Sequence, residues 1–84
     1  MKENYFDELK IRMYCAADNV NSQAIEKDIN RNHVNYGSVT TLALIMRDFG
    51  HTTDIPVWED DNGCLRIPYI EIDGQKFIEF PNGK

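Results

Sequence analysis

The side chains best suited to metal binding are two cysteines and two histidines. Cys15, Cys64, His33 and His51 carry the atoms of a Cys2His2 zinc site. Zinc sites of this class place about two to four residues between the cysteines and about three to five between the histidines. Neither pair has such spacing, so the sequence predicts no bound metal.

Other residues that could do chemistry also lack the pattern that catalysis needs. Asp60 and Asp61 are adjacent in a turn-forming segment, which suits solvation better than paired acid–base work. The chain has no glycine-rich phosphate loop, no dinucleotide-binding fingerprint and no nucleophile elbow. Cys15 falls on a predicted apolar face, where a thiol acts as a small buried hydrophobe. We therefore predict no enzymatic activity and no cofactor.

Length and composition indicate one domain over residues 1–84. The chain is 42% hydrophobic and 27% charged, which is typical of a folded protein. No apolar run approaches the roughly 18 residues of a membrane span, and the first residues lack the apolar core of a signal peptide. With only two cysteines, these features predict a cytoplasmic location and no membrane partner.

The net charge of −5 is unevenly distributed along the chain. Residues 1–50 hold six basic and seven acidic side chains, whereas residues 51–84 hold three basic and seven acidic. Phosphate attraction supplies most of the affinity of nucleic-acid-binding proteins. The sequence therefore lacks a basic footprint, although its first half is close to neutral.

The first half of the chain predicts three helices, over residues 4–17, 22–31 and 38–49. Apolar side chains recur at helical spacing in each segment. A polar turn over residues 32–37 includes Gly37, Ser38 is the expected N-cap of the third helix, and Gly50 is expected to end it. Residues 10–16 also fit a strand, because alternate apolar residues would share one face.

The second half predicts three strands, over residues 55–59, 65–72 and 76–80. Asn62-Gly63 and Asp73-Gly74 between them are strong hairpin signals. Pro68 cannot donate to a sheet and so indicates a bulge, an edge or a break in the middle strand. Fold class is thus α+β, with three helices followed by a β-hairpin wing.

Part of the chain resembles a winged helix-turn-helix domain. The helix, polar turn and helix of that domain correspond to SQAIEKDINRNHVNYGSVTTLALIMRDFGH, and its wing corresponds to IPVWEDDNGCLRIPYIEI. The polar turn is longer than usual and is closer to the winged helices of phage and mobile-element replication proteins. The resemblance implies a small regulator that binds DNA or a DNA-associated protein, with its third helix in the major groove. The residues it places at nucleic acid are Arg31, His33, Tyr36, Ser38, Thr40, Thr41, Arg47 and Arg66.

An alternative is a thioredoxin-like fold, with strands over residues 10–16 and 33–37. The segment RIPYIEIDGQKFIEF resembles the proline-containing hairpin of glutaredoxins. Where those proteins carry Cys-x-x-Cys, this chain reads Asn19-Val20-Asn21-Ser22, so a redox dithiol is missing. Under this fold Cys15 and Cys64 would lie near each other and could form a reversible disulfide.

A third alternative is an acidic protein-interaction module, such as an inhibitor. Aromatic residues often dominate protein interfaces, and Trp58, on an edge strand beside an acidic turn, is the one expected to be partly exposed. The C-terminal strands also leave an unpaired edge, through which two copies could form a homodimer.

Overall fold

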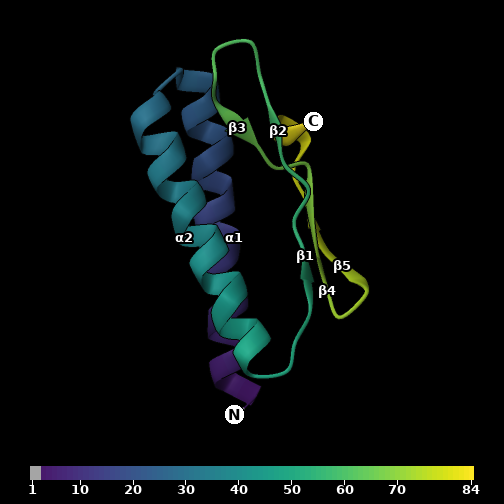
Figure 1. Cartoon of the computed structure of the whole chain (residues 1–84). Coiled ribbons are helices and arrows are strands. Elements are labelled where there is room, and N and C mark those ends of the chain that lie inside the picture. The colour runs from purple at the N-terminus through teal and green to yellow at the C-terminus, as the bar shows by residue number, and fades with distance from the viewer. Residues whose placement is uncertain (1–2) are drawn as a thin grey trace.

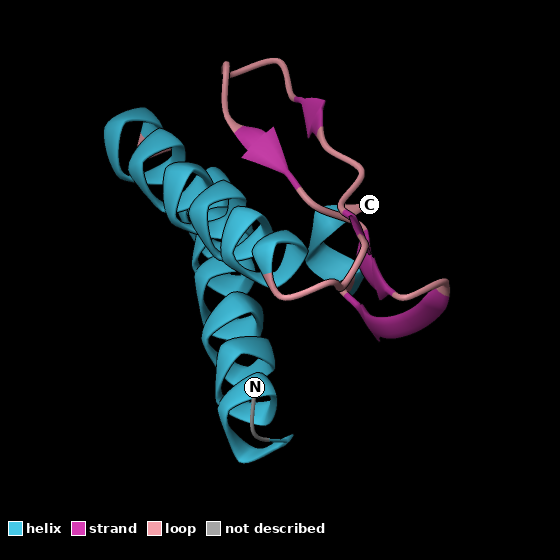
Figure 2. Ribbon diagram, turned by 60° about the horizontal axis from the view of Figure 1, so that its bottom comes forward, coloured by secondary structure: helices cyan, strands magenta, loops and turns pink. Residues whose placement is uncertain are grey.

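The computed structural model describes residues 3–84, which form two long helices followed by short strands (Figure 1). The two helices lie side by side as a helical hairpin and make one layer. The strands make a second layer on one side of this hairpin (Figure 2). The elements are α1 Glu3–Glu26, α2 Ile29–Asp48, β1 Thr53–Asp54, β2 Trp58–Glu59, β3 Leu65–Arg66, β4 Tyr69–Ile72, β5 Gln75–Glu79 and a final 3-10 turn, Pro81–Gly83.

The α+β class is confirmed, but the prediction of three helices is wrong. The break expected after residue 17 does not form, because Val20 and Ala24 continue the buried face of α1. The chain turns instead at Lys27, which has a φ of 61°. Asp28 then caps α2 by accepting a hydrogen bond from the Arg31 amide at 3.3 Å.

The predicted polar turn over residues 32–37 lies inside α2. Asn32, whose polarity suggested a turn, is fully buried and bonded to backbone groups. Gly37 and Ser38 are helical, so Ser38 is not an N-cap. Gly50 does end α2, with the positive φ of 90° that a helix-terminating glycine adopts.

Residues 10–16 and 33–37 are helical throughout. The two strands that the thioredoxin-like alternative requires there are therefore absent, and that layout is wrong. Leu9, Met13 and Ala17 are buried on one side of a long helix, whereas Ile11 and Cys15, which would share a strand face with Met13, are exposed.

The strands form two small antiparallel sheets, β1-β4-β5 and β2-β3. The strand predicted over residues 65–72 is divided into β3 and β4 at Pro68, which cannot donate to a sheet. Asp73 and Gly74 connect β4 to β5 with φ values of 53° and 81°, as the Asp-Gly signal predicts. The predicted strand over 55–59 is reduced to β2, and β1 forms ahead of it.

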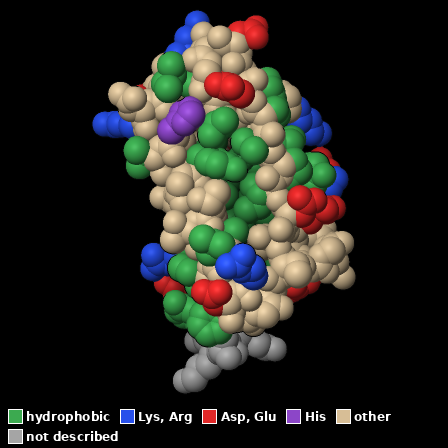
Figure 3. Space-filling model, in the orientation of Figure 1, with side chains coloured by type: hydrophobic (Ala, Val, Ile, Leu, Met, Phe, Trp, Pro, Cys, Tyr) green, Lys and Arg blue, Asp and Glu red, His purple; other side chains and the backbone are tan. Residues whose placement is uncertain are grey.

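The hydrophobic core lies between the helical layer and the strands. On the face seen in Figure 3, apolar atoms form a band between the two layers, where the edge of the core meets solvent. Burial of these side chains is the main favourable contribution to folding. The buried apolar residues of the core cluster are Leu9, Met13, Ala16, Ala17, Val20, Val39, Met46, Ile67, Ile70, Ile72 and Phe80.

Two buried asparagines fasten the strand layer to the helices. The Asn21 amide donates to the Ile67 carbonyl at 2.9 Å, and its carbonyl accepts from the Ile67 amide at 2.8 Å. Asn32 makes the same two bonds to Leu65, at 2.9 and 2.7 Å. Each side chain thus satisfies one donor and one acceptor of the backbone, as a neighbouring strand would.

The C-terminal turn closes tightly against this fastened segment. A Cβ atom on Gly83 would lie 1.9 Å from the Ile67 carbonyl oxygen and 2.8 Å from Asn21 Nδ2. Only glycine allows the backbone to approach so closely. Position 83 is therefore restricted by packing.

Candidate interaction groove

The three arginines predicted to contact nucleic acid lie at the two ends of α2 and on β3. Arg66 lies on the two-stranded sheet, where its Nε donates to Asp60 at 3.0 Å. That hydrogen bond lowers the pKa of the Asp60 carboxyl below its ordinary value. Arg31 is in the first turn of α2 and Arg47 in its last turn, and both are exposed. Their contact with nucleic acid stays a prediction.

Three further predicted residues on α2 have separate surroundings. A ring nitrogen of His33 lies 3.0 Å from the Gly63 carbonyl, so this histidine contacts the β2–β3 connection. Tyr36 is partly buried against the core. The Thr40 hydroxyl donates to the Gly37 carbonyl at 2.9 Å. All three make contacts that stabilise the fold.

Trp58, predicted as a partly exposed interface residue, is 42% exposed. Its indole nitrogen donates to the Gly83 carbonyl at 2.8 Å, and the Arg66 guanidinium lies 5.7 Å from its ring centroid. These contacts hold one face of the ring. The role of Trp58 in an interface stays a prediction.

Both cysteines are free, and they lie in different surroundings. Cys64 is buried beside β3, and this burial raises the pKa of its thiol. Cys15, predicted to be buried on an apolar face, is exposed. The prediction was wrong because the buried face of α1 passes through Met13 and Ala17, on the other side of the helix.

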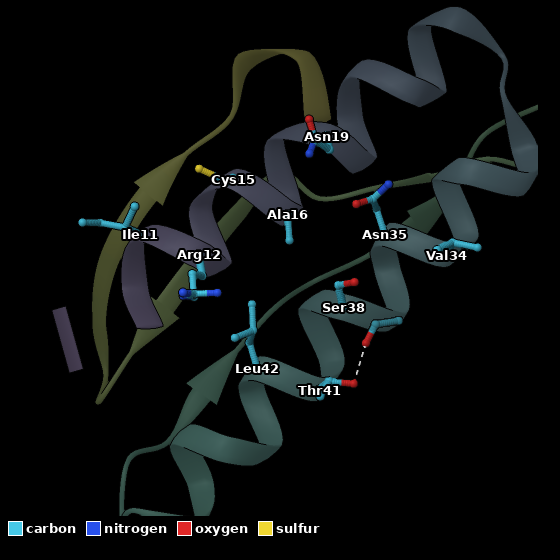
Figure 4. Close-up of a pocket in the computed structure, with 11 residues that line it drawn as sticks. Ile11, Arg12, Cys15, Ala16, Asn19, Val34, Asn35, Ser38, Thr41 and Leu42 are labelled. Atoms are coloured by element: carbon cyan, nitrogen blue, oxygen red, sulfur yellow. Dashed lines mark hydrogen bonds between the residues drawn. The ribbon is translucent and has the colours of Figure 1, made fainter. Parts of the chain in front are cut away.

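A hollow runs between α1 and α2, on the side of the hairpin away from the strands (Figure 4). It has a volume of about 730 Å³. A smaller hollow of about 310 Å³ continues it toward the N-terminus of α1 and shares Arg12 and Leu42. We call both together the hairpin groove. Its lining is Tyr5, Glu8, Leu9, Ile11, Arg12, Cys15, Ala16 and Asn19 of α1, and Val34, Asn35, Gly37, Ser38, Thr41, Leu42 and Ile45 of α2.

The middle of the larger hollow is lined by Ala16, Ser38 and Leu42, and exposed apolar side chains lie at its ends. Ala16 of α1 and Leu42 of α2 point toward the opposite helix (Figure 4), and Ser38 lines the hollow between them. Ile11 and Val34 lie at opposite ends in that view, and they are 62% and 70% exposed. In helix-in-groove recognition, an amphipathic helix lays its apolar face into such a groove.

One ion pair in the groove lining joins two residues of α1. Arg12 donates through Nη2 and Nε to the same Glu8 oxygen, at 2.8 and 3.3 Å. This hydrogen bond raises the pKa of the Arg12 guanidinium above its ordinary value. Arg12 is the only charged side chain that lines the larger hollow. Its guanidinium and the Glu8 carboxylate are both more than half exposed.

A second polar cluster lies near the start of α1 and packs against it. His51 Nδ1 is 2.7 Å from Asp73 Oδ2, and its ring stacks on Phe6 at 3.8 Å. The Thr52 amide donates to the second Asp73 oxygen at 2.9 Å. Hydrogen bonds from Thr52 and His51 lower the pKa of Asp73. The cluster ties α1 to the turn between β4 and β5.

A metal site, a membrane-spanning helix or a similar protein would each be evidence of function. Residues 3–84 contain no group of three or more His, Cys, Asp or Glu that could hold a metal ion. No described helix is long and apolar enough to cross a membrane. Comparisons with protein-family models, curated proteins and solved structures found no match.

The predicted site residues include Ser38 and Thr41 of the groove, where both are exposed. Ile11, Arg12 and Val34 were not predicted. A signal for them exists, because Ile11 lies on the side of α1 opposite to Leu9 and Met13, the residues that face the core. An apolar side chain off the core face of a helix indicates either chance exposure or a contact surface.

Proposed function

We propose that this protein is a non-enzymatic interaction module that binds a helical segment of a partner protein along the hairpin groove. The observation that carries this proposal is the uncovered outer side of the helical hairpin, with apolar Ile11 and Val34 exposed at the ends of a continuous hollow. Both are positioned on rigid helices, as the anchors of an interface are.

The shape of the groove favours a single helix as the occupant. A furrow between two packed helices accepts the ridge of a third helix, and small side chains allow its axis to come close. On α1 the lining extends from Tyr5 to Asn19, about 21 Å at 1.5 Å per residue. A segment of about 14 helical residues would span it.

A second copy of this chain is a poorer fit for the groove. It would present the same concave furrow, and two facing furrows leave unfilled space between them. The edge of the C-terminal strands, predicted as a dimer contact, is formed by β5. This strand has a register shift opposite Ile70 and Glu71, and it carries the charged Lys76. Bulges and lysines at edge strands oppose strand pairing.

Charge also favours a protein over nucleic acid as the partner. The chain has a net charge of −5, and Arg31 and Arg47 lie at opposite ends of α2. DNA affinity depends on several cations that face the phosphates together. Ser38 and Thr41 are the predicted DNA contacts that the proposed protein interface would use instead.

The test is a selection of helix-forming 14-residue peptides displayed against the immobilised full chain. Recovered peptides should bind wild type and lose at least about tenfold in affinity for the double variant Ile11→Gln, Val34→Gln, because two apolar anchors are removed. Leu44→Gln is the matched control, since Leu44 is 49% exposed on α2 but does not line the groove. Peptides that bind the double variant and wild type with equal affinity would refute the proposal.

A titration with duplex DNA distinguishes the proposed peptide-binding module from a DNA-binding regulator. The proposal expects no saturable binding at about 0.15 M salt. Binding that weakens steeply with salt and with Arg31→Ala or Arg47→Ala would favour the DNA-binding regulator instead.

A further inference from the structure

We infer that the helix bound in the hairpin groove carries a carboxylate that lies against Arg12. This inference rests on the proposed function and adds the chemistry of the partner. It starts from the position of Arg12, which lines both parts of the groove and is 65% exposed in the free protein. An occupant of the groove therefore covers the guanidinium.

The hydrogen bonds of Arg12 leave donors for a partner. A guanidinium has five N–H groups, and two of them donate to one Glu8 oxygen. The remaining N–H groups have no acceptor among the described side chains, and the Arg12 side chain is open to solvent in the free protein. When a helix covers the groove, it removes that water, and a buried charge without full hydrogen bonding is costly.

The bound helix has to supply the missing acceptors from a side chain. Backbone carbonyls in the middle of a helix are already used within that helix. A carboxylate matches the planar fork of a guanidinium and is the strongest acceptor for it. Apart from Glu8, which already pairs with Arg12 through one oxygen, the neighbouring lining is uncharged at Ala16, Ser38 and Leu42.

The peptides selected in the previous test measure this inference directly. Among binders of the wild-type chain, Asp or Glu should occur at one position of the apolar stripe. Replacing that residue by Gln or Asn should weaken binding about fivefold. The same selection on Arg12→Glu should recover Lys or Arg at that position, and on Arg12→Gln the preference for Asp or Glu should be lost.

The outcomes separate the inference from the function on which it rests. Binders that depend on Ile11 and Val34 but show the same residues on wild type and Arg12→Glu would overturn the inference and leave the groove function intact. Binders with a basic residue at that position on wild type would also overturn it. Binders that ignore Ile11 and Val34 would overturn the groove function itself. Circular dichroism of Arg12→Glu and Arg12→Gln verifies that both variants keep the helical hairpin.

Discussion

The two long sides of the helical hairpin differ in how they are covered. On the side that faces the strands, Met13, Val20, Val39 and Met46 have no exposed surface. On the opposite side, Ile11 and Val34 are mostly exposed and lie at opposite ends of the larger hollow of the hairpin groove. The first side accounts for the fold. Exposed apolar residues on the second side contribute little to folding, and they are the residues that the proposed interface would use.

The largest loss of stability is expected on the side of the hairpin that faces the strands, where buried asparagines bond to the strand backbone. Asn32→Ala leaves the amide and carbonyl of Leu65 without their partners. We expect a loss of roughly 3 kcal/mol in the free energy of unfolding, and a melting temperature lower by more than about 10 °C. Urea unfolding measures the first and calorimetry the second.

Asn30→Ala is the control for this comparison, because Asn30 is exposed on the same helix. It should change stability by less than about 0.5 kcal/mol. Equal effects of the two alanine variants would show that the buried amide does not fasten the strands.

A smaller but clear loss is expected for Gly83→Ala. The new Cβ would collide with the Ile67 carbonyl, so the C-terminal turn must move away from the strands. Overpacking of this kind costs about 2 kcal/mol. Trp58 fluorescence should change as well, since its indole donates to the Gly83 carbonyl. A variant with wild-type stability would contradict the tight closure.

The outer side should behave in the opposite way. The double variant Ile11→Gln, Val34→Gln should stay within about 0.5 kcal/mol of wild type in urea unfolding, because both side chains are already mostly exposed. Its expected defect is the loss of peptide binding. A loss of more than about 2 kcal/mol would mean that the outer side also stabilises the fold.

The smallest effect concerns acid stability at the turn between β4 and β5. The folded pKa of Asp73 is lowered, so its carboxylate stabilises the protein above the unfolded pKa of about 3.9. That contribution is lost as the pH falls through the lowered folded pKa. Asp73→Asn should therefore unfold with a shallower dependence on pH between about 2.5 and 5. Asparagine also tolerates the positive φ of 53° at this position. Wild type and Asp73→Asn with the same pH dependence of stability would contradict this role of Asp73.

The sequence predicts the parts of the fold that depend on local patterns. Gly50 and the Asp73-Gly74 turn follow from backbone conformations that few residues adopt, and Pro68 divides a strand because it lacks an N–H. The helix bounds were wrong because Asn21 and Asn32 look like turn residues. Only tertiary contacts show that they are buried and bonded to distant backbone groups.

The groove was harder to predict than the fold. Ser38 and Thr41 were identified for a different reason, as contacts of a DNA-reading helix. Ile11 and Arg12 become neighbours of Val34 and Leu42 only because α1 and α2 pack as a hairpin. That pairing depends on a turn at Lys27 and Asp28, for which the sequence has neither a glycine nor a proline.

The most direct test of the account is an NMR titration of the full chain with a selected helical peptide. The largest amide shifts should lie on the lining of the hairpin groove, from residues 8–19 of α1 and 34–45 of α2. The amides of β3, β4 and β5 should change little. Shifts centred on the strands or on Trp58 would place the binding surface on the other side of the molecule and contradict the account.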